Sequence, residues 1–197
     1  MEEKPSIKPE ELRVEKLDNR HLYVIDKFKS SNIDLTNFLK EDSLRNERLS
    51  INSTYLLFYN PLNELVAFVS LCSDAIKVNN TKLKELFDSE GVDYKTLPAI
   101  KICRLSVDKN YEKRGIGAIM VNAIFRMVLE INDKISCRFI YVDSKRESIN
   151  FYKSKGFEIL KNREKGTLPM YYDLIKEIRL WKKTKDELNK LKEQHSE

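Results

Sequence analysis

The sequence predicts an α/β (α+β) fold: a mixed central sheet of about seven strands, helices on both faces, and a C-terminal helical tail. Three observations predict it. Strand-like and helical patterns alternate from Ala99 onward, and before Ala99 two helical patterns precede a strand pair joined by the turn "NPLN". No Gly/Ser/Pro-rich linker divides the 197 residues. We therefore expect one domain over residues 1–175, followed by a charged amphipathic helix over residues 176–197.

The N-terminal half contains one strand, two helices and a strand pair. "LRVEKL" (12–17) alternates apolar and polar residues as a half-buried strand does, whereas "NRHLYVIDKF" (19–28) and "NIDLTNFLKEDSLRN" (32–46) have helical spacing. Asn32 is placed to cap the second helix. "STYLLFYN" (53–60) and "ELVAFVSL" (64–71) are the expected hairpin strands. Residues 79–98 are polar with one short helical patch, and we expect them to form an excursion at the edge of the sheet.

The C-terminal half predicts a strand, a long helix, a strand, a short helix and two final strands. The segments in order are "AIKICRLSVD" (99–108), a four-turn stripe from Ile116 to Ile131, "CRFIYVDS" (137–144), "ESINFYKSKG" (147–156), "FEILKN" (157–162) and "LPMYYDL" (168–174). Gly156 is the expected C-cap of the short helix. In the tail, Ile178, Trp181, Leu188 and Leu191 share one side of a helix. This stripe either folds back on its own domain or docks on a partner or on a second copy, forming a homodimer.

Composition limits the class of protein. Hydrophobic residues make up 41% and charged residues 34%, as in soluble globular domains, and the apolar run "LVAFV" is far shorter than the roughly 20 residues of a membrane span. The first ten residues lack a signal-peptide core, so we expect a cytoplasmic protein without a membrane partner. Cys72, Cys103 and Cys137 fit neither a disulfide framework nor a metal site and are expected in the core. His21 and His195 are expected on the surface.

The segment "VDKNYEKRGIGAIM" (107–120) predicts an anion site. A strand is followed by a loop with two glycines that opens a helix, where unpaired backbone N–H groups and the helix dipole attract phosphate. A P-loop would need Lys and Ser or Thr after its second glycine, and a dinucleotide loop would begin directly after the strand, whereas Gly115 comes eight residues after Val107. Gly115 could instead simply form a turn, but Lys113 and Arg114 beside it favour a polyanion. The net charge of +5 weakly favours an acidic partner.

The segment "RLSVDKNYEKRGIGAIMVNAI", followed about thirty residues later by "SINFYKSKGF", resembles the GNAT superfamily of acetyl-CoA-dependent N-acetyltransferases. The first part is similar to the family's pyrophosphate signature and the second to its "FY..GF" segment. The resemblance covers most of the chain and implies a GNAT-like fold. One position departs from the signature, because Glu112 stands where the family has Gln or Arg. We predict that Glu112→Gln tightens acetyl-CoA binding.

The resemblance implies a role for each matching residue. The backbone of Leu105, Ser106 and Val107 would pair with the pantetheine arm of acetyl-CoA, and the parallel strands there would splay to admit it. Tyr152 would be the general acid that protonates the leaving thiolate. The residues that would wrap the pyrophosphate are Glu112, Lys113, Arg114, Gly115, Ile116, Gly117 and Ala118. No metal is implied. Without the glycine loop, Tyr152 would be interpreted as an ordinary aromatic residue of an amphipathic helix.

The expected reaction is acetyl transfer to a primary amine by direct attack in a ternary complex. The N-terminal segment, with Phe28, Asp34, Leu35, Phe38 and Leu39, also resembles toxin-type GNAT proteins and their non-toxin relatives. That resemblance implies one alternative, an acetyltransferase of aminoacyl-tRNA with an antitoxin partner, and a modest basic charge is compatible with RNA. A second alternative is a non-catalytic module that binds acyl-CoA or acts through its C-terminal helix.

Overall fold

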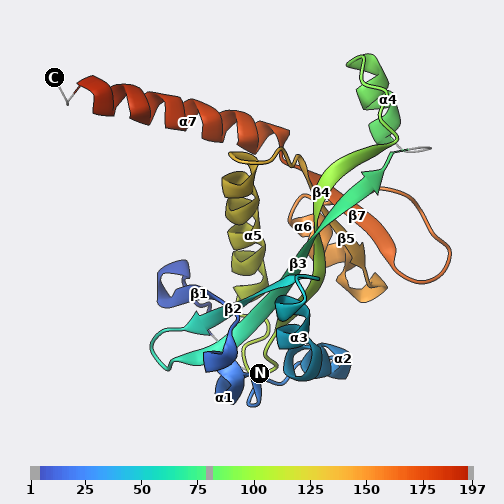
Figure 1. Cartoon of the computed structure of the whole chain (residues 1–197). Helices are drawn as coiled ribbons and strands as arrows, with labels where there is room; N and C mark the ends of the chain where they lie inside the picture. The colour runs from blue at the N-terminus through green and yellow to red at the C-terminus, as the bar shows by residue number, and fades with distance from the viewer. Residues whose placement is uncertain (1–4, 79–81, 195–197) are drawn as a thin grey trace. The chain divides into compact units, whose positions relative to one another are not determined.

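The computed structural model describes residues 5–78 and 82–194. Its strands form a seven-stranded sheet in the order β1-β2-β3-β4-β5-β7-β6, which confirms the predicted mixed sheet, and a C-terminal helix, α7, is present (Figure 1). The strands are β1 (Leu12–Lys16), β2 (Ser53–Tyr59), β3 (Glu64–Lys77), β4 (Thr96–Val107), β5 (Phe139–Ser144), β6 (Glu158–Ile159) and β7 (Leu168–Asp173). The α-helices are α1 (Leu22–Ile25), α2 (Ile33–Asn37), α3 (Ser43–Arg48), α4 (Lys82–Ser89), α5 (Ile116–Asn132), α6 (Ile149–Ser154) and α7 (Ile175–Gln194).

The chain forms two compact units, one of Met1–Ser73 with Lys101–Ile124 and one of Asp74–Ile100 with Phe125–Glu197. In the first unit, β1 pairs antiparallel with β2, and β2 pairs antiparallel with β3. Asn32 caps α2 as predicted, since its side chain accepts a hydrogen bond from the Asp34 amide at 3.0 Å. A π-helical turn (Phe38–Asp42) joins α2 to α3, so the predicted second helix is one helical segment with a wider turn inside it.

The core of the first unit lies between these helices and the strand pair. Phe68 on β3 packs edge-on against Phe28 at 5.4 Å between ring centroids and is stacked on Phe38 at 6.1 Å. Phe28 and Phe68 are almost fully buried, and Leu39 and Leu56 belong to the same buried cluster. Because aromatic side chains bury large areas, these rings fix the two helices on the sheet.

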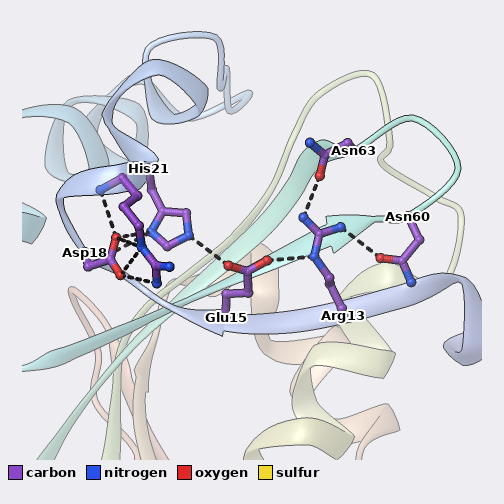
Figure 2. Close-up of polar contacts among 7 residues, drawn as sticks. Arg13, Glu15, Asp18, His21, Asn60 and Asn63 are labelled. Atoms are coloured by element: carbon purple, nitrogen blue, oxygen red, sulfur yellow. Dashed lines mark hydrogen bonds and ion pairs between the residues drawn. The ribbon is translucent and has the colours of Figure 1, made fainter.

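The prediction for His21 was wrong, because the residue is 6% exposed. The amide of Asp18 donates to Nδ1 at 3.1 Å, and Nε2 lies 3.1 Å from Oε2 of Glu15 (Figure 2). Arg13 donates to Glu15 at 2.6 Å and to Asn60 at 2.9 Å, which ties β1 to the turn between β2 and β3. The hydrogen bonds from His21 and Arg13 lower the pKa of Glu15. His195 lies outside the described residues.

In the second unit, β7 pairs antiparallel with both β5 and β6. The apolar cluster of this unit includes Phe87 of α4, Phe139 of β5 and Tyr171 of β7, with ring centroids 6.0–6.1 Å apart. The interpretation of residues 79–98 as an excursion at the sheet edge was wrong. β3 continues to Lys77 and β4 already begins at Thr96, and these two strands are neighbours in the sheet, so α4 connects two central strands. The polar residues Ser73 and Asp74 hid the continuation of β3.

Candidate active site

The glycine loop follows β4 and leads into α5, as predicted. Gly115 has a left-handed backbone (φ +79°), and an added Cβ would meet no atom within 4 Å. The amides of Ala118 and Ile119 both donate to the Gly115 carbonyl, which leaves the N–H groups of Ile116 and Gly117 in the first helical turn without an acceptor inside the helix. An exposed, unobstructed glycine beside these amides leaves room for an anion at the start of α5.

Asp108 anchors the beginning of this loop to the link between α1 and α2. Its carboxylate is buried and accepts two backbone hydrogen bonds, from Lys29 at 2.9 Å and from Asn110 at 2.9 Å. The Lys29 carbonyl in turn accepts from the Lys109 amide at 2.8 Å. A carboxylate that satisfies two amides in this way holds two segments of chain in one geometry. The loop therefore leaves β4 at a position set by the α1–α2 link.

The α1–α2 link also contacts Glu112, the residue that departs from the family signature. The hydroxyl of Ser31 donates to Oε1 of Glu112 at 2.6 Å, and the hydroxyl of buried Ser106, at the end of β4, donates to that of Ser30 at 2.7 Å. The Glu112 carboxylate is exposed, and its hydrogen bond connects the loop to the link. A glutamate can make this bond because Ser31 lies opposite it.

Arg114 is held by the N-terminal segment. Its Nε donates to the Pro5 carbonyl at 2.9 Å, and its own carbonyl accepts from the Ile7 amide at 3.2 Å. The guanidinium lies 5.3 Å from the centroid of the Tyr111 ring, within cation–π range. Tyr111 donates a hydrogen bond to Glu64, and burial together with this carboxylate raises the pKa of Tyr111 to about 12. Beside Arg114, Lys113 is exposed and has a left-handed backbone (φ +61°).

A cavity of about 410 Å³ lies next to the loop within the first unit. Residues of α1, of the turn between β2 and β3 and of the loop line it, among them Tyr23, Lys27, Asn63, Glu64, Asn110 and Tyr111. Its walls combine aromatic rings with amide and charged groups.

Tyr152 belongs to the second unit, on the short helix α6. It is 6% exposed, and its ring packs against Phe151 at 5.1 Å and Phe157 at 5.2 Å between centroids. Burial raises the pKa of its phenol, so the hydroxyl keeps its proton throughout the neutral range. Among the residues that the structure describes, no hydrogen-bond partner is assigned to this hydroxyl.

Gly156 ends α6 as predicted. It has φ +83°, its amide donates to the Lys153 carbonyl at 3.0 Å, and the Phe157 amide donates to the Tyr152 carbonyl at 3.1 Å. This is the Schellman arrangement, which requires a left-handed residue directly after the helix. It turns the chain so that Phe157 comes back onto Tyr152.

Residues 52–159, more than half of the chain, match the family model for the acetyltransferase (GNAT) domain. The chain belongs to the GNAT acetyltransferase family. It is therefore an N-acetyltransferase, and the family uses acetyl-CoA.

Similar solved structures come from toxin-type GNAT proteins. AtaT complexed with acetyl-methionyl-tRNAfMet is similar with a TM-score of 0.74 and 23% identity, over 86% of this chain and 98% of that one. A tyrosine-to-phenylalanine mutant of KacT has a TM-score of 0.72 and 20% identity, over 88% of this chain and 99% of that one. A mutant AtaT toxin bound to the C-terminus of the antitoxin AtaR and acetyl-CoA has a TM-score of 0.69 and 22% identity, over 86% of this chain and 97% of that one. These likenesses show the GNAT fold.

A second hollow in this GNAT protein lies beside α6, within the second unit. It has a volume of about 780 Å³ and is lined by four lysines, by Phe157 and by residues of β6. Lys82, Lys153 and Lys161 are exposed, whereas Lys84 is paired with Asp88 and, at 2.8 Å, with Asp93. We name this hollow, with Lys82, Lys153 and Lys161 on its wall, the lysine cleft. Glu85 and Glu158 also line the hollow, so its four lysines outnumber the lining carboxylates, and this surplus of positive charge suits a ligand that carries phosphate groups.

The C-terminal helix packs on the second unit over its first turns. Ile178 is buried, and both Trp181, through Nε1 at 3.2 Å, and Lys185 bind the carboxylate of Asp133. Farther along, Leu188 is 51% exposed. The predicted stripe is therefore divided between a part that folds back and an exposed part. Within the described ranges, no helix is long and apolar enough to cross a membrane.

The predicted site residues come from both compact units. Leu105–Val107 and the loop Glu112–Ala118 belong to the first unit, whereas Tyr152 belongs to the second. Ser30, Ser31 and Asp108, which position the loop, were not predicted from the sequence. The dipeptide Ser30-Ser31 between two predicted helices signalled local hydrogen bonding, but its partners are about 80 residues away in the chain and no local pattern identifies them.

Proposed function

We propose that this enzyme transfers the acetyl group of acetyl-CoA to the α-amino group of an aminoacyl-tRNA. In this proposal the first-turn amides of α5 and the loop Glu112–Ala118 bind the pyrophosphate of acetyl-CoA, and the backbone of Leu105–Val107 binds the pantetheine arm. The observation that carries the cofactor part is the left-handed, unobstructed Gly115 at the start of α5. Backbone amides provide this binding, so an acidic side chain at position 112 is compatible with it.

The chemistry is a direct attack of the neutral amine on the thioester carbonyl. A carbon–nitrogen bond forms, the carbon–sulfur bond breaks, and the electron pair of that bond leaves on the thiolate. The attacking nitrogen gives up one proton to water, and water later returns one to the phenolate that Tyr152 becomes. Tyr152 donates its phenolic proton to that sulfur, whose conjugate acid has a pKa of about 8.5 by analogy with cysteine. Burial raises the pKa of the Tyr152 phenol, so the group is protonated before the attack and gives up its proton only as negative charge develops on the sulfur. Loss of such a general acid costs about a hundredfold to ten-thousandfold in rate.

The lysine cleft supports an acceptor that carries phosphates. Lys153 is the residue after Tyr152, and Phe157, whose ring contacts Tyr152, also lines the cleft. A phosphate backbone bound there would bring the acceptor to the helix of the proposed acid. The similarity in fold to AtaT, which was solved with acetyl-methionyl-tRNAfMet, favours aminoacyl-tRNA over a small amine.

The test is acetyl transfer from labelled acetyl-CoA to purified aminoacyl-tRNA, with the product identified by the mass of its acetyl-aminoacyl-adenosine end. We expect transfer to charged tRNA and none to uncharged tRNA or free amino acid. Lys153→Glu and Lys161→Glu should raise the KM for tRNA while leaving the acetyl-CoA Kd unchanged. Each should also reduce the slope of log K for tRNA against log salt concentration by about one. Lys134→Glu, an exposed lysine that does not line the cleft, is the matched control. Transfer to a small amine but not to tRNA would contradict the choice of acceptor.

An antitoxin is the partner that accompanies this proposal. The mutant AtaT toxin was solved with the C-terminus of the antitoxin AtaR, and this chain has the same fold. A neighbouring small reading frame whose product binds this chain and blocks acetyl transfer would support the partner. Growth unaffected by expression of the active enzyme alone would contradict a toxin role.

A further inference from the structure

Two of the three cysteines lie in contact in the first unit. Cys72 of β3 and Cys103 of β4 have their sulfur atoms 3.0 Å apart, and the thiol of Cys103 donates to the sulfur of Cys72. Both side chains are half-buried rather than part of the core, so the expectation that they are core residues was wrong for this pair. A disulfide has a sulfur–sulfur bond of about 2.05 Å, so bond formation would require an approach of roughly 1 Å.

Cys137, in contrast, is a core residue as predicted. It is 4% exposed in the second unit, and its sulfur bonds the Phe139 carbonyl at 3.5 Å. Burial raises the pKa of its thiol, which disfavours the reactive thiolate. The chain therefore contains an accessible pair and a buried single cysteine, which provides an internal control for thiol chemistry.

We propose that Cys72 and Cys103 form a modification site at which a low-molecular-weight disulfide, such as glutathione disulfide, introduces a reversible bond between β3 and β4. The sulfur of Cys72 attacks one sulfur of the oxidant, forming a mixed disulfide and releasing one thiol. The sulfur of Cys103, deprotonated in this step, then attacks the Cys72 sulfur and releases the second thiol. Two protein thiols become one disulfide, and the oxidant is reduced to two thiols.

The surroundings of Cys103 set the pH dependence of the second step. Burial and the hydrogen bond to Cys72 raise the pKa of the Cys103 thiol to about 12, which slows ring closure at neutral pH and makes it faster as pH rises. Cys103 lies two residues before Leu105 on the same face of β4. The bond would therefore tie β4 to β3 beside the segment that we assign to the pantetheine arm. Formation of the bond does not depend on that assignment.

The test uses the whole chain, oxidised with glutathione disulfide at about pH 8 and then alkylated and weighed. We expect a chain that carries one alkyl group instead of three, that weighs about 2 Da less than the unmodified chain plus that one group, and that retains no glutathione. We also expect a Cys72–Cys103 peptide that dithiothreitol removes. Cys137→Ser should behave like the wild type apart from its missing thiol. Cys72→Ser and Cys103→Ser, near-isosteric changes at half-buried positions, should abolish the bond.

Two results would overturn the proposal. One is a wild-type chain that retains three free thiols under conditions that oxidise a model dithiol peptide. The other is stable glutathionylation of Cys72 or Cys103 without closure to the disulfide. A circular dichroism spectrum and melting curve of each serine variant would show that it is folded, so loss of the bond is assigned to the missing sulfur. Acetyl transfer is not needed as a readout, so failure of the proposed function would leave this result unaffected.

Discussion

Substitution of Gly115 by alanine separates the backbone role of this glycine from any packing role. A Cβ at this position meets no atom within 4 Å, so the structural cost comes from the left-handed backbone (φ +79°). That conformation costs an L residue about 1–2 kcal/mol, and reduced freedom of the unfolded chain returns about 0.4–1 kcal/mol. The net loss of stability is about 1 kcal/mol, which lowers the Tm of a domain of this size by roughly 2–4 °C.

The effect of Gly115→Ala on acetyl-CoA should be larger than its effect on stability. If the new methyl group or a shifted loop removes one hydrogen bond from a backbone amide to the pyrophosphate, about 1.5–3 kcal/mol of binding is lost. The Kd measured by calorimetry should then rise about 10- to 100-fold. Gly166 is the matched control, because it has φ +75° and equally open surroundings. Gly166→Ala should lose the same stability and keep the wild-type Kd.

Gly156 differs from Gly115 and Gly166 because its surroundings are closed. Its φ is +83°, and an added Cβ would lie 2.8 Å from a ring carbon of Tyr172, so Gly156→Ala should destabilise the protein more than either of the other changes. The reasoning about the loop would be refuted if Gly115→Ala bound acetyl-CoA with the wild-type Kd. It would also be refuted if Gly166→Ala weakened binding equally.

Three further predictions concern the loop and the polar network of β1. Glu112→Gln removes a negative charge but can still accept from Ser31, so the acetyl-CoA Kd should fall about twofold to fivefold; an unchanged or higher Kd would count against it. Asp108→Ala leaves two backbone amides without their acceptor and should lower the free energy of unfolding in urea by about 2–4 kcal/mol, whereas a loss below about 0.5 kcal/mol would contradict the anchor role. The pKa of Glu15 is lowered from 4.5, chiefly by His21, and that of Asp18 to about 2, chiefly by Arg20. Both carboxylates therefore stabilise the fold above their unfolded pKa values, and this stability should be lost as pH falls from about 4.5 towards 2, with a shallower loss in Glu15→Gln.

The order of elements could be predicted from the sequence because periodicity is a local signal. The stripe of α5, the cap at Asn32 and the left-handed Gly156 each depend on residues within a few positions of one another. The end of β3 could not be placed, because Ser73 and Asp74 resemble a strand end although the chain stays extended as far as Lys77. Pairing with a neighbouring strand overrides such local polarity.

The candidate site also has parts that could be predicted from the sequence and parts that could not. The glycine loop is contiguous in sequence and could be predicted, whereas the left-handed backbone of Gly115 was found only in the structure. The serines that position it and the contact between Cys72 and Cys103 depend on segments far apart in the chain, so they became visible only in the structure. His21 was missed because its neighbours are charged, and those same charged neighbours satisfy the buried ring.

The most direct test of the central claim is single-turnover acetyl transfer from acetyl-CoA to aminoacyl-tRNA by the wild type and by Tyr152→Phe, with acetyl-CoA affinity measured in parallel. The account predicts an acetylated aminoacyl end with the wild type. For Tyr152→Phe it predicts a rate at least about a hundredfold lower at an unchanged acetyl-CoA Kd. Transfer by Tyr152→Phe at the wild-type rate would contradict the role of Tyr152. Failure of the wild type to transfer acetyl to aminoacyl-tRNA would contradict the proposed acceptor.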